Sequence, residues 1–139
     1  MQNIYITTPI YYVNDQPHIG HAYTSIICDT ISRFFLLKGY NVKFTTGTDE
    51  HGLKVEQAAI KNNIPPKDFV DKVSRNFFDL SKKLKLTNDD FIRTTEDRHH
   101  VSARKFWGNL EKNNQIYKGK YSGWYSIKDE SYYQEKVLI

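Results

Sequence analysis

The sequence contains almost no cysteine and no long run of apolar residues. Cys28 is the only cysteine among 139 residues, so an internal disulfide cannot form and the CxxC pairs of a structural zinc site are absent. No stretch reaches the roughly 20 apolar residues that a membrane-spanning helix needs. The amino-terminal residues lack the basic and apolar parts of a secretory signal, and there are no repeats or low-complexity tracts. These absences predict a cytoplasmic protein with no membrane span.

The sequence also lacks a strong charge of either sign. Twenty basic and sixteen acidic side chains give a net charge of +4, a weak attraction for polyanions that is also common in proteins that never bind nucleic acid. Apolar residues make up 39% and charged residues 26%, which is typical of a folded rather than a disordered chain. The length fits one domain of roughly 100 to 200 residues.

The first half of the sequence predicts alternating strands and helices. β-Branched and aromatic residues alternate with polar ones over Asn3–Thr8, which indicates a strand. Apolar residues then recur every three or four positions over Ile19–Leu37, which predicts a helix with a buried apolar face. A second strand is predicted over Asn41–Thr46, ending at Gly47, and a shorter helix over Leu53–Asn62. Strands joined by such a helix favour a parallel pair with a right-handed crossover, so we expect an α/β, Rossmann-like nucleotide-binding sheet.

The second half predicts further helices and then short strands. Pro65-Pro66 begins a helix with one apolar stripe, and Asp90–Thr94 indicates a strand, with Thr95 as the cap of the next helix. Beyond Ile116 the composition shifts to Tyr, Trp, Ser and Gly, which predicts small β-hairpins. We therefore expect a first domain over 1–115 and the start of a small β-rich subdomain over 116–139. Because Val137-Leu138-Ile139 is still apolar, we expect this subdomain to continue past Ile139. The residues of the apolar stripe are Phe69, Val70, Val73, Phe77, Leu80 and Leu84.

Two polar segments follow the first two predicted strands, over Pro9–Gly20 and Gly47–Gly52. In an open parallel sheet, ligands bind beyond the carboxyl ends of the strands, so we expect both segments to face the same crevice. Both are dense in ionisable residues and glycine, which favours a binding site. The first segment and the residue after it hold Asn14, Asp15, His18, Gly20 and His21, and the second holds Thr48, Asp49, Glu50 and His51.

His18 and His21 flank the predicted start of the long helix. Unpaired backbone N–H groups and the helix dipole favour an anion there, and Gly20 allows close approach. The imidazoles are expected to donate hydrogen bonds to phosphate oxygens, more strongly when protonated. Two alternatives are an incidental histidine pair and a divalent metal site completed by Asp49 and His51. The position after a strand and at a helix start favours a phosphate site.

Four segments in the same order resemble the class I aminoacyl-tRNA synthetases, in the form found in the methionyl-tRNA synthetases. The first carries the motif spelled HIGH, the second resembles an active-site loop, the third another family segment, and the fourth the start of the inserted connective domain. Together they make the resemblance more specific than HIGH alone. They are Thr8-Pro9-Ile10-Tyr11-Tyr12-Val13-Asn14-Asp15-Gln16-Pro17-His18-Ile19-Gly20-His21, Thr46-Gly47-Thr48-Asp49-Glu50-His51-Gly52, Asp89-Asp90-Phe91-Ile92-Arg93-Thr94-Thr95-Glu96 and Gly123-Trp124-Tyr125-Ser126.

The resemblance implies an enzyme that joins methionine to tRNA(Met). Methionine and ATP, with Mg²⁺, would give methionyl-adenylate and pyrophosphate before the acyl group moves to tRNA. His18, Gly20 and His21 would bind ATP, with the two histidines acting catalytically by stabilising charge as pyrophosphate leaves.

The resemblance also implies a methionine site and assigns residues to it. Ile10 and Tyr12 would line the pocket for the thioether side chain. Asp49 would pair with the ammonium group, and a fixed carboxylate there would discriminate against neutral analogues. His51 and Gly52 would only shape the loop.

Departures from the family pattern lead to further expectations. Ser126 and Asp129 stand where many members have the first cysteine pair of a zinc knuckle, so no zinc is expected. The family's Lys-Met-Ser-Lys-Ser loop is absent, so the chain alone should have little or no activity. The alternatives are a small HxGH nucleotidyltransferase, a non-catalytic nucleotide-binding fragment and a metal-dependent hydrolase.

Overall fold

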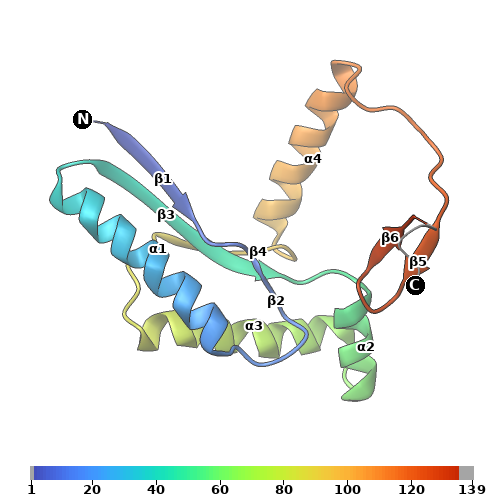
Figure 1. Cartoon of the computed structure of the whole chain (residues 1–139), viewed down its shortest axis with the longest axis horizontal. Coiled ribbons are helices and arrows are strands. Elements are labelled where there is room, and N and C mark those ends of the chain that lie inside the picture. Colours follow the sequence, from blue (N-terminus) through green and yellow to red (C-terminus); the bar gives the residue numbers. More distant parts are fainter. Residues whose placement is uncertain (1, 135–139) are drawn as a thin grey trace. The chain divides into compact units, whose positions relative to one another are not determined.

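The computed structural model describes residues 2–134 and has the α/β architecture expected from the sequence. Strands and helices alternate through most of the chain, and a short hairpin follows (Figure 1). By its contacts the chain divides into two compact units, Met1–Val101 and Ser102–Ile139. The predicted domain boundary at residue 115 stays a prediction. The elements are β1 (Asn3–Thr7), β2 (Tyr11–Tyr12), α1 (Ile19–Leu37), β3 (Asn41–Asp49), α2 (Leu53–Lys61), α3 (Pro66–Lys83), β4 (Asp90–Arg93), α4 (Asp97–Lys112), β5 (Trp124–Ser126) and β6 (Ser131–Tyr133).

β3 is the central strand of a parallel sheet in the first unit. Thr45 pairs with Thr7 of β1 and with Asp90 of β4, while Thr48 pairs with Tyr11 of β2 and with Arg93 of β4. Thus β4 lies on one side of β3, and β1 followed by β2 lies on the other. The two crossovers step in the same direction across the sheet, which places α1 and α3 on the same face. The predicted parallel sheet is confirmed.

The core of the first unit lies beside β2, between α2 and α3. The apolar stripe predicted for α3 is confirmed, because Phe69, Val70, Val73 and Phe77 are buried. Val55 and Ala59 of α2 pack into the same cluster, together with Tyr11 and Val13. The helix boundaries also agree with the sequence, since Pro66 occupies the first turn of α3 and needs no backbone donor there.

The predicted extent of α1 is confirmed, but its predicted buried face is wrong. Ala22, Ser25, Asp29 and Ser32 form the buried stripe. These short side chains let the helix pack closely, and Asp29 is satisfied by two hydrogen bonds from Thr87 and an ion pair with Arg33. The apolar residues that defined the sequence pattern instead lie exposed within the described residues, and they include Ile19, Tyr23, Ile26, Ile31, Phe34 and Leu37.

Three further boundary predictions are wrong at the site end of the sheet. β3 does not end at Gly47 but runs on to Asp49, because β2 and β4 pair with its last residues. The Pro9–Gly20 segment is not all loop, since it contains β2. Thr95 does not cap α4, which begins at Asp97; its hydroxyl bonds to Glu50 instead.

The second unit contains the predicted hairpin. β5 and β6 pair antiparallel, and Ser126 and Asp129 bond to each other between them, with the hydroxyl 2.7 Å from Oδ2. The expectation that no zinc binds there stays a prediction. The apolar end at Val137–Ile139 lies outside the described residues. No helix in residues 2–134 has the length and apolarity needed to cross a membrane.

Candidate active site

β2 is only two residues long, yet it contacts residues from both segments of the predicted site. Successive side chains of a strand point to opposite faces. Tyr11 points to the helix-covered face, where its ring stacks on Phe77 and meets the edge of His21, with centroids 5.7 and 4.9 Å apart. Tyr12 points to the other face and is the direct partner of Asp49 in β3. β2 therefore contacts His21 through one residue and pairs with Asp49 through the next. That these residues form one site for ATP and methionine stays a prediction.

His18 and His21 form a reciprocal cap at the start of α1. Nδ1 of His18 accepts a hydrogen bond from the backbone N–H of Gly20, and Nδ1 of His21 accepts one from the N–H of His18, each at 3.1 Å. The two rings stack with centroids 3.8 Å apart. The expectation from the sequence is that these amides are unpaired and available to an anion. That expectation is wrong, because the imidazoles already occupy them.

The cap determines which ring atoms a ligand can use. A neutral imidazole that accepts at Nδ1 carries its proton at Nε2, so each ring offers Nε2–H as a donor. Burial lowers the pKa of His21 below that of an ordinary histidine, and the neighbouring His18 lowers it further. The expectation that protonation strengthens the contact therefore does not fit His21. A phosphate would be met by neutral N–H donors at the positive end of the helix dipole.

Asp49 is the residue predicted to pair with the methionine ammonium group. It is half-buried, and its backbone oxygen accepts a hydrogen bond from Val13 at 3.3 Å, which continues the β2 pairing. Within residues 2–134 no hydrogen bond or ion pair engages its carboxylate. Tyr12 beside it is half-buried, and Ile10, two residues earlier, is 47% exposed. That these three residues bind methionine stays a prediction.

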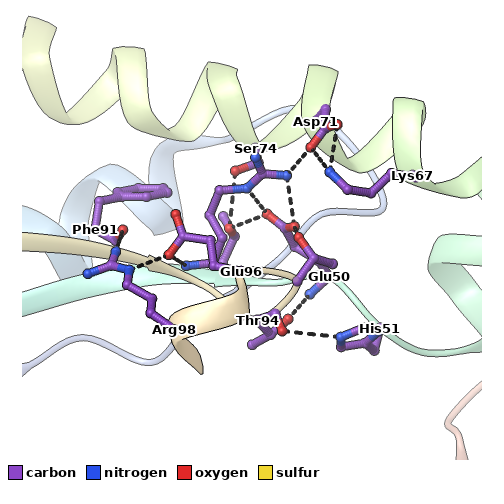
Figure 2. Close-up of polar contacts among 12 residues, drawn as sticks. Glu50, His51, Lys67, Asp71, Ser74, Phe91, Thr94, Glu96 and Arg98 are labelled. Carbon is purple, nitrogen blue, oxygen red and sulfur yellow. Dashed lines mark hydrogen bonds and ion pairs between the residues drawn. The ribbon is translucent and has the colours of Figure 1, made fainter. Parts of the chain in front are cut away.

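Glu50, the next residue, has the opposite character. Its side chain is fully buried and accepts hydrogen bonds from Arg93, Thr48 and Thr95 (Figure 2). Burial alone would raise the pKa of Glu50, but the hydrogen bonds from Arg93, Thr95 and Thr48 outweigh it and lower the pKa below its ordinary value. Glu50 is therefore a buried, ionised carboxylate whose side chain is held in place by these partners. The sequence predicts no individual role for Glu50 or Arg93, although an arginine in a short strand beside apolar residues indicates that a buried acid lies nearby.

His51 and Gly52 complete the turn after β3. Nε2 of His51 lies 3.3 Å from the backbone oxygen of Thr94, and Gly52 adopts φ 112° where α2 begins. Such a positive φ favours glycine, which fits a residue that shapes the turn. A hollow of about 500 Å³ lies alongside, lined by Glu50, His51, Gly52, Leu53, Val55, Glu56 and Pro66.

The alternative metal site is not assembled in the part of the chain that the structure describes. No three His, Cys, Asp or Glu side chains between residues 2 and 134 lie in a group that could hold a metal ion. His18 and His21 are engaged with each other, and His51 is engaged with Thr94. The metal-dependent hydrolase therefore has no support in this geometry.

Comparison with known proteins identifies the family. The family model described as tRNA synthetases class I (M) matches residues 4–139, nearly the whole chain. The chain belongs to this family of class I tRNA synthetases. It is 59% identical over 134 residues to the methionine–tRNA ligase of Rickettsia typhi (strain ATCC VR-144 / Wilmington) and 50% identical over 135 residues to that of Bacillus subtilis (strain 168). These matches cover 96% and 97% of the chain.

Solved structures agree with the family assignment. Methionyl-tRNA synthetase of Mycobacterium tuberculosis, in complex with methionyl-adenylate, superposes with a TM-score of 0.91 at 43% identity and covers 98% of this synthetase chain. The chain spans only 26% and 20% of the two ligases and 27% of the solved chain. The family and its Rossmann-like fold are thus shown, and the small HxGH nucleotidyltransferase loses its support.

Proposed function

We propose that this chain supplies the ATP- and methionine-binding part of a methionine–tRNA ligase. The observation that carries the proposal is the β2 arrangement, in which Tyr12 is paired with Asp49 while Tyr11 contacts His21. β2 therefore connects Asp49, whose carboxylate is available to an amino group, with the His18 and His21 rings, whose Nε2–H groups are available to phosphates. The relative from M. tuberculosis is bound to methionyl-adenylate, a molecule that contains both groups.

On this proposal, Asp49 binds the methionine ammonium and thereby orients the carboxylate that attacks the α-phosphate of ATP. Ile10 and Tyr12 contact the side chain, since a thioether favours apolar and aromatic partners. Nε2–H of His18 and of His21 donates to phosphate oxygens as negative charge shifts towards pyrophosphate, and Gly20 lets the nucleotide approach the helix start. Catalysis rests on positioning and on charge stabilisation, with no covalent enzyme intermediate.

The proposal extends to partners and location. The acyl group would pass to tRNA(Met), the reaction would take place in the cytoplasm, and Mg²⁺ would accompany ATP. No group of His, Cys, Asp or Glu side chains within residues 2–134 fits a metal ion. Residues 1–139 by themselves are expected to show little or no activity.

Methionine-dependent exchange of pyrophosphate into ATP tests the proposal. The assay uses the longest open reading frame that contains this chain, with each of the other amino acids as a specificity control. We expect exchange with methionine and its loss in Asp49→Ala and in His21→Ala. Asp79→Ala is the matched control, because Asp79 pairs with Arg75 on α3, and this variant should retain exchange. Efficient exchange with a different amino acid would refute the proposed substrate.

A further inference from the structure

Glu50 is bound too completely to serve as a ligand for substrate. Its carboxylate accepts from Nε of Arg93 at 2.7 Å, from Nη2 of Arg93 at 2.9 Å and from the Thr48 hydroxyl at 2.7 Å, and it also accepts from Thr95. A buried carboxylate is tolerated only when it is paired and hydrogen-bonded in this way. Asp49, one residue earlier, has no such partner in residues 2–134. Glu50 is therefore suited to a structural role, whereas the Asp49 carboxylate is available to a ligand.

The backbone around Glu50 is fixed by the same partner strand. The N–H of Glu50 donates to the Thr94 hydroxyl at 2.8 Å, and the N–H of Thr94 donates to the backbone oxygen of Thr48 at 3.2 Å. Nε2 of His51 lies 3.3 Å from the backbone oxygen of Thr94. Thr48, Glu50 and His51 are thus all bonded to Thr94, the residue that follows β4. Because Asp49 lies between Thr48 and Glu50, the direction of its side chain depends on the carboxyl end of β4.

Arg93 extends this attachment from the strand ends to α3. Its Nη2 also bonds to Asp71, which in turn accepts from Lys67 at 2.7 Å (Figure 2). Hydrogen bonds from Lys67 and Arg93 lower the pKa of Asp71, so this carboxylate stays ionised beside the guanidinium. A bidentate guanidinium–carboxylate pair fixes both the distance and the plane of its partner, unlike a lysine, which acts as a point charge.

We propose that Arg93, acting through Glu50, is a positioning residue that sets the Asp49 carboxylate for the ammonium group of the amino acid. This role rests on the proposed function, since it assumes that Asp49 binds methionine. On this proposal Arg93 acts on Asp49 and contacts neither substrate. Its loss should disturb the amino-acid site at the end of β3 much more than the ATP site at the start of α1.

The test measures KM and kcat for methionine and for ATP in the exchange reaction, again with the longest open reading frame. In Arg93→Met we expect KM for methionine to rise about ten- to a hundredfold, because a displacement near 1 Å has effects of this size, while KM for ATP stays nearly unchanged. Arg33→Met is the matched control. Arg33 also pairs with an acid, Asp29, and bonds to the Lys85 backbone oxygen, but at the amino end of β4. It should leave KM for methionine unchanged.

Milder variants keep the test decisive if Arg93→Met folds poorly. Arg93→Lys keeps the charge but loses the bidentate geometry, and Thr95→Val removes a single donor to Glu50; both should raise KM for methionine less than Arg93→Met does. A purely structural role would reduce the active fraction and lower kcat with KM unchanged. That result in all three variants, or an equal rise of KM for both substrates, would overturn the positioning role. Absence of methionine-dependent exchange in the wild type would instead refute the proposed function.

Discussion

Tyr12 lies directly beside Asp49, because the two residues are partners in the parallel pairing of β2 with β3. The preceding residue, Tyr11, contacts His21 and is held by a 2.8 Å hydrogen bond between its hydroxyl and that of Ser25. A change in β2 would therefore move both halves of the proposed site. This explains how two segments about 30 residues apart in the sequence form one structural unit.

Replacing Asp49 with asparagine should weaken methionine binding with little effect on ATP. Asparagine has nearly the same shape but no charge, and hydrogen bonds to charged groups contribute about 1.5 to 3 kcal/mol, or roughly ten- to a hundredfold in affinity. The measurement is the separate KM for methionine and for ATP in the exchange assay. Asp79→Asn is the control. An unchanged KM for methionine would exclude Asp49 as the ammonium partner.

His21 should be neutral at pH 7 with its proton on Nε2. Burial and His18 lower the pKa of His21, and the backbone N–H of His18 occupies its Nδ1. Because the folded pKa is below the unfolded one, this residue's contribution to stability is present above about pH 6.5 and declines as the pH falls. Nitrogen-detected NMR of the histidine rings reports both tautomer and pKa. An imidazolium at pH 7, or a proton on Nδ1, would contradict the capping geometry.

Gly47→Ala should destabilise the protein, although Gly47 touches no proposed substrate. A Cβ at this position would stand 2.0 Å from the backbone oxygen of Ile92 in β4, so the strands would have to separate. We expect a loss of about 1 to 3 kcal/mol in the free energy of unfolding, as for other overpacked sites. Gly108→Ala in α4 is the control, because within residues 2–134 no atom beyond the neighbouring helix backbone lies within 4 Å of where its Cβ would stand. Equal stability of the two variants in urea unfolding would show that β3 and β4 do not approach this closely.

The stability difference between wild type and Arg93→Met should depend on pH. Glu50 has a lowered pKa in the folded protein, so its stabilising contribution is present above the ordinary glutamate pKa of about 4.3 and is lost as the pH falls through the folded value. At pH 7 the variant leaves a buried carboxylate without its main partner, at a cost of about 3 kcal/mol. Protonation of Glu50 as the pH falls should shrink this difference. Urea unfolding between pH 3 and 7 measures it, and a constant difference would mean that Glu50 is not charged in the fold.

The sequence predicted elements well where local pattern and packing agree. The stripe of α3 is apolar and buried, so its helix and its face were both correct. In α1 the extent was correct but the buried face was not, because close packing selected Ala22 and Ser25 over the larger apolar residues. β2 could not be predicted, since two residues carry no periodicity and pair only because β3 is already there.

The roles of the candidate site residues were proposed from the sequence and stay predictions, whereas the contacts that support these residues could not be predicted. His18, His21 and Asp49 carry recognisable side chains in recognisable segments, so their positions could be anticipated. The Glu50–Arg93 pair joins residues 43 apart in the sequence and exists only through tertiary structure. The capping bonds between His18 and His21 were missed because histidine is not among the usual capping residues.

A crystal structure with a bound non-hydrolysable methionyl-adenylate analogue would show whether Asp49 receives the ammonium group. We expect the ammonium nitrogen within about 3 Å of the Asp49 carboxylate, the thioether side chain against Tyr12, and a phosphate-mimicking oxygen within hydrogen-bond distance of Nε2 of His18 or His21. An analogue bound with its ammonium away from Asp49, or seated elsewhere on the chain, would contradict this expectation.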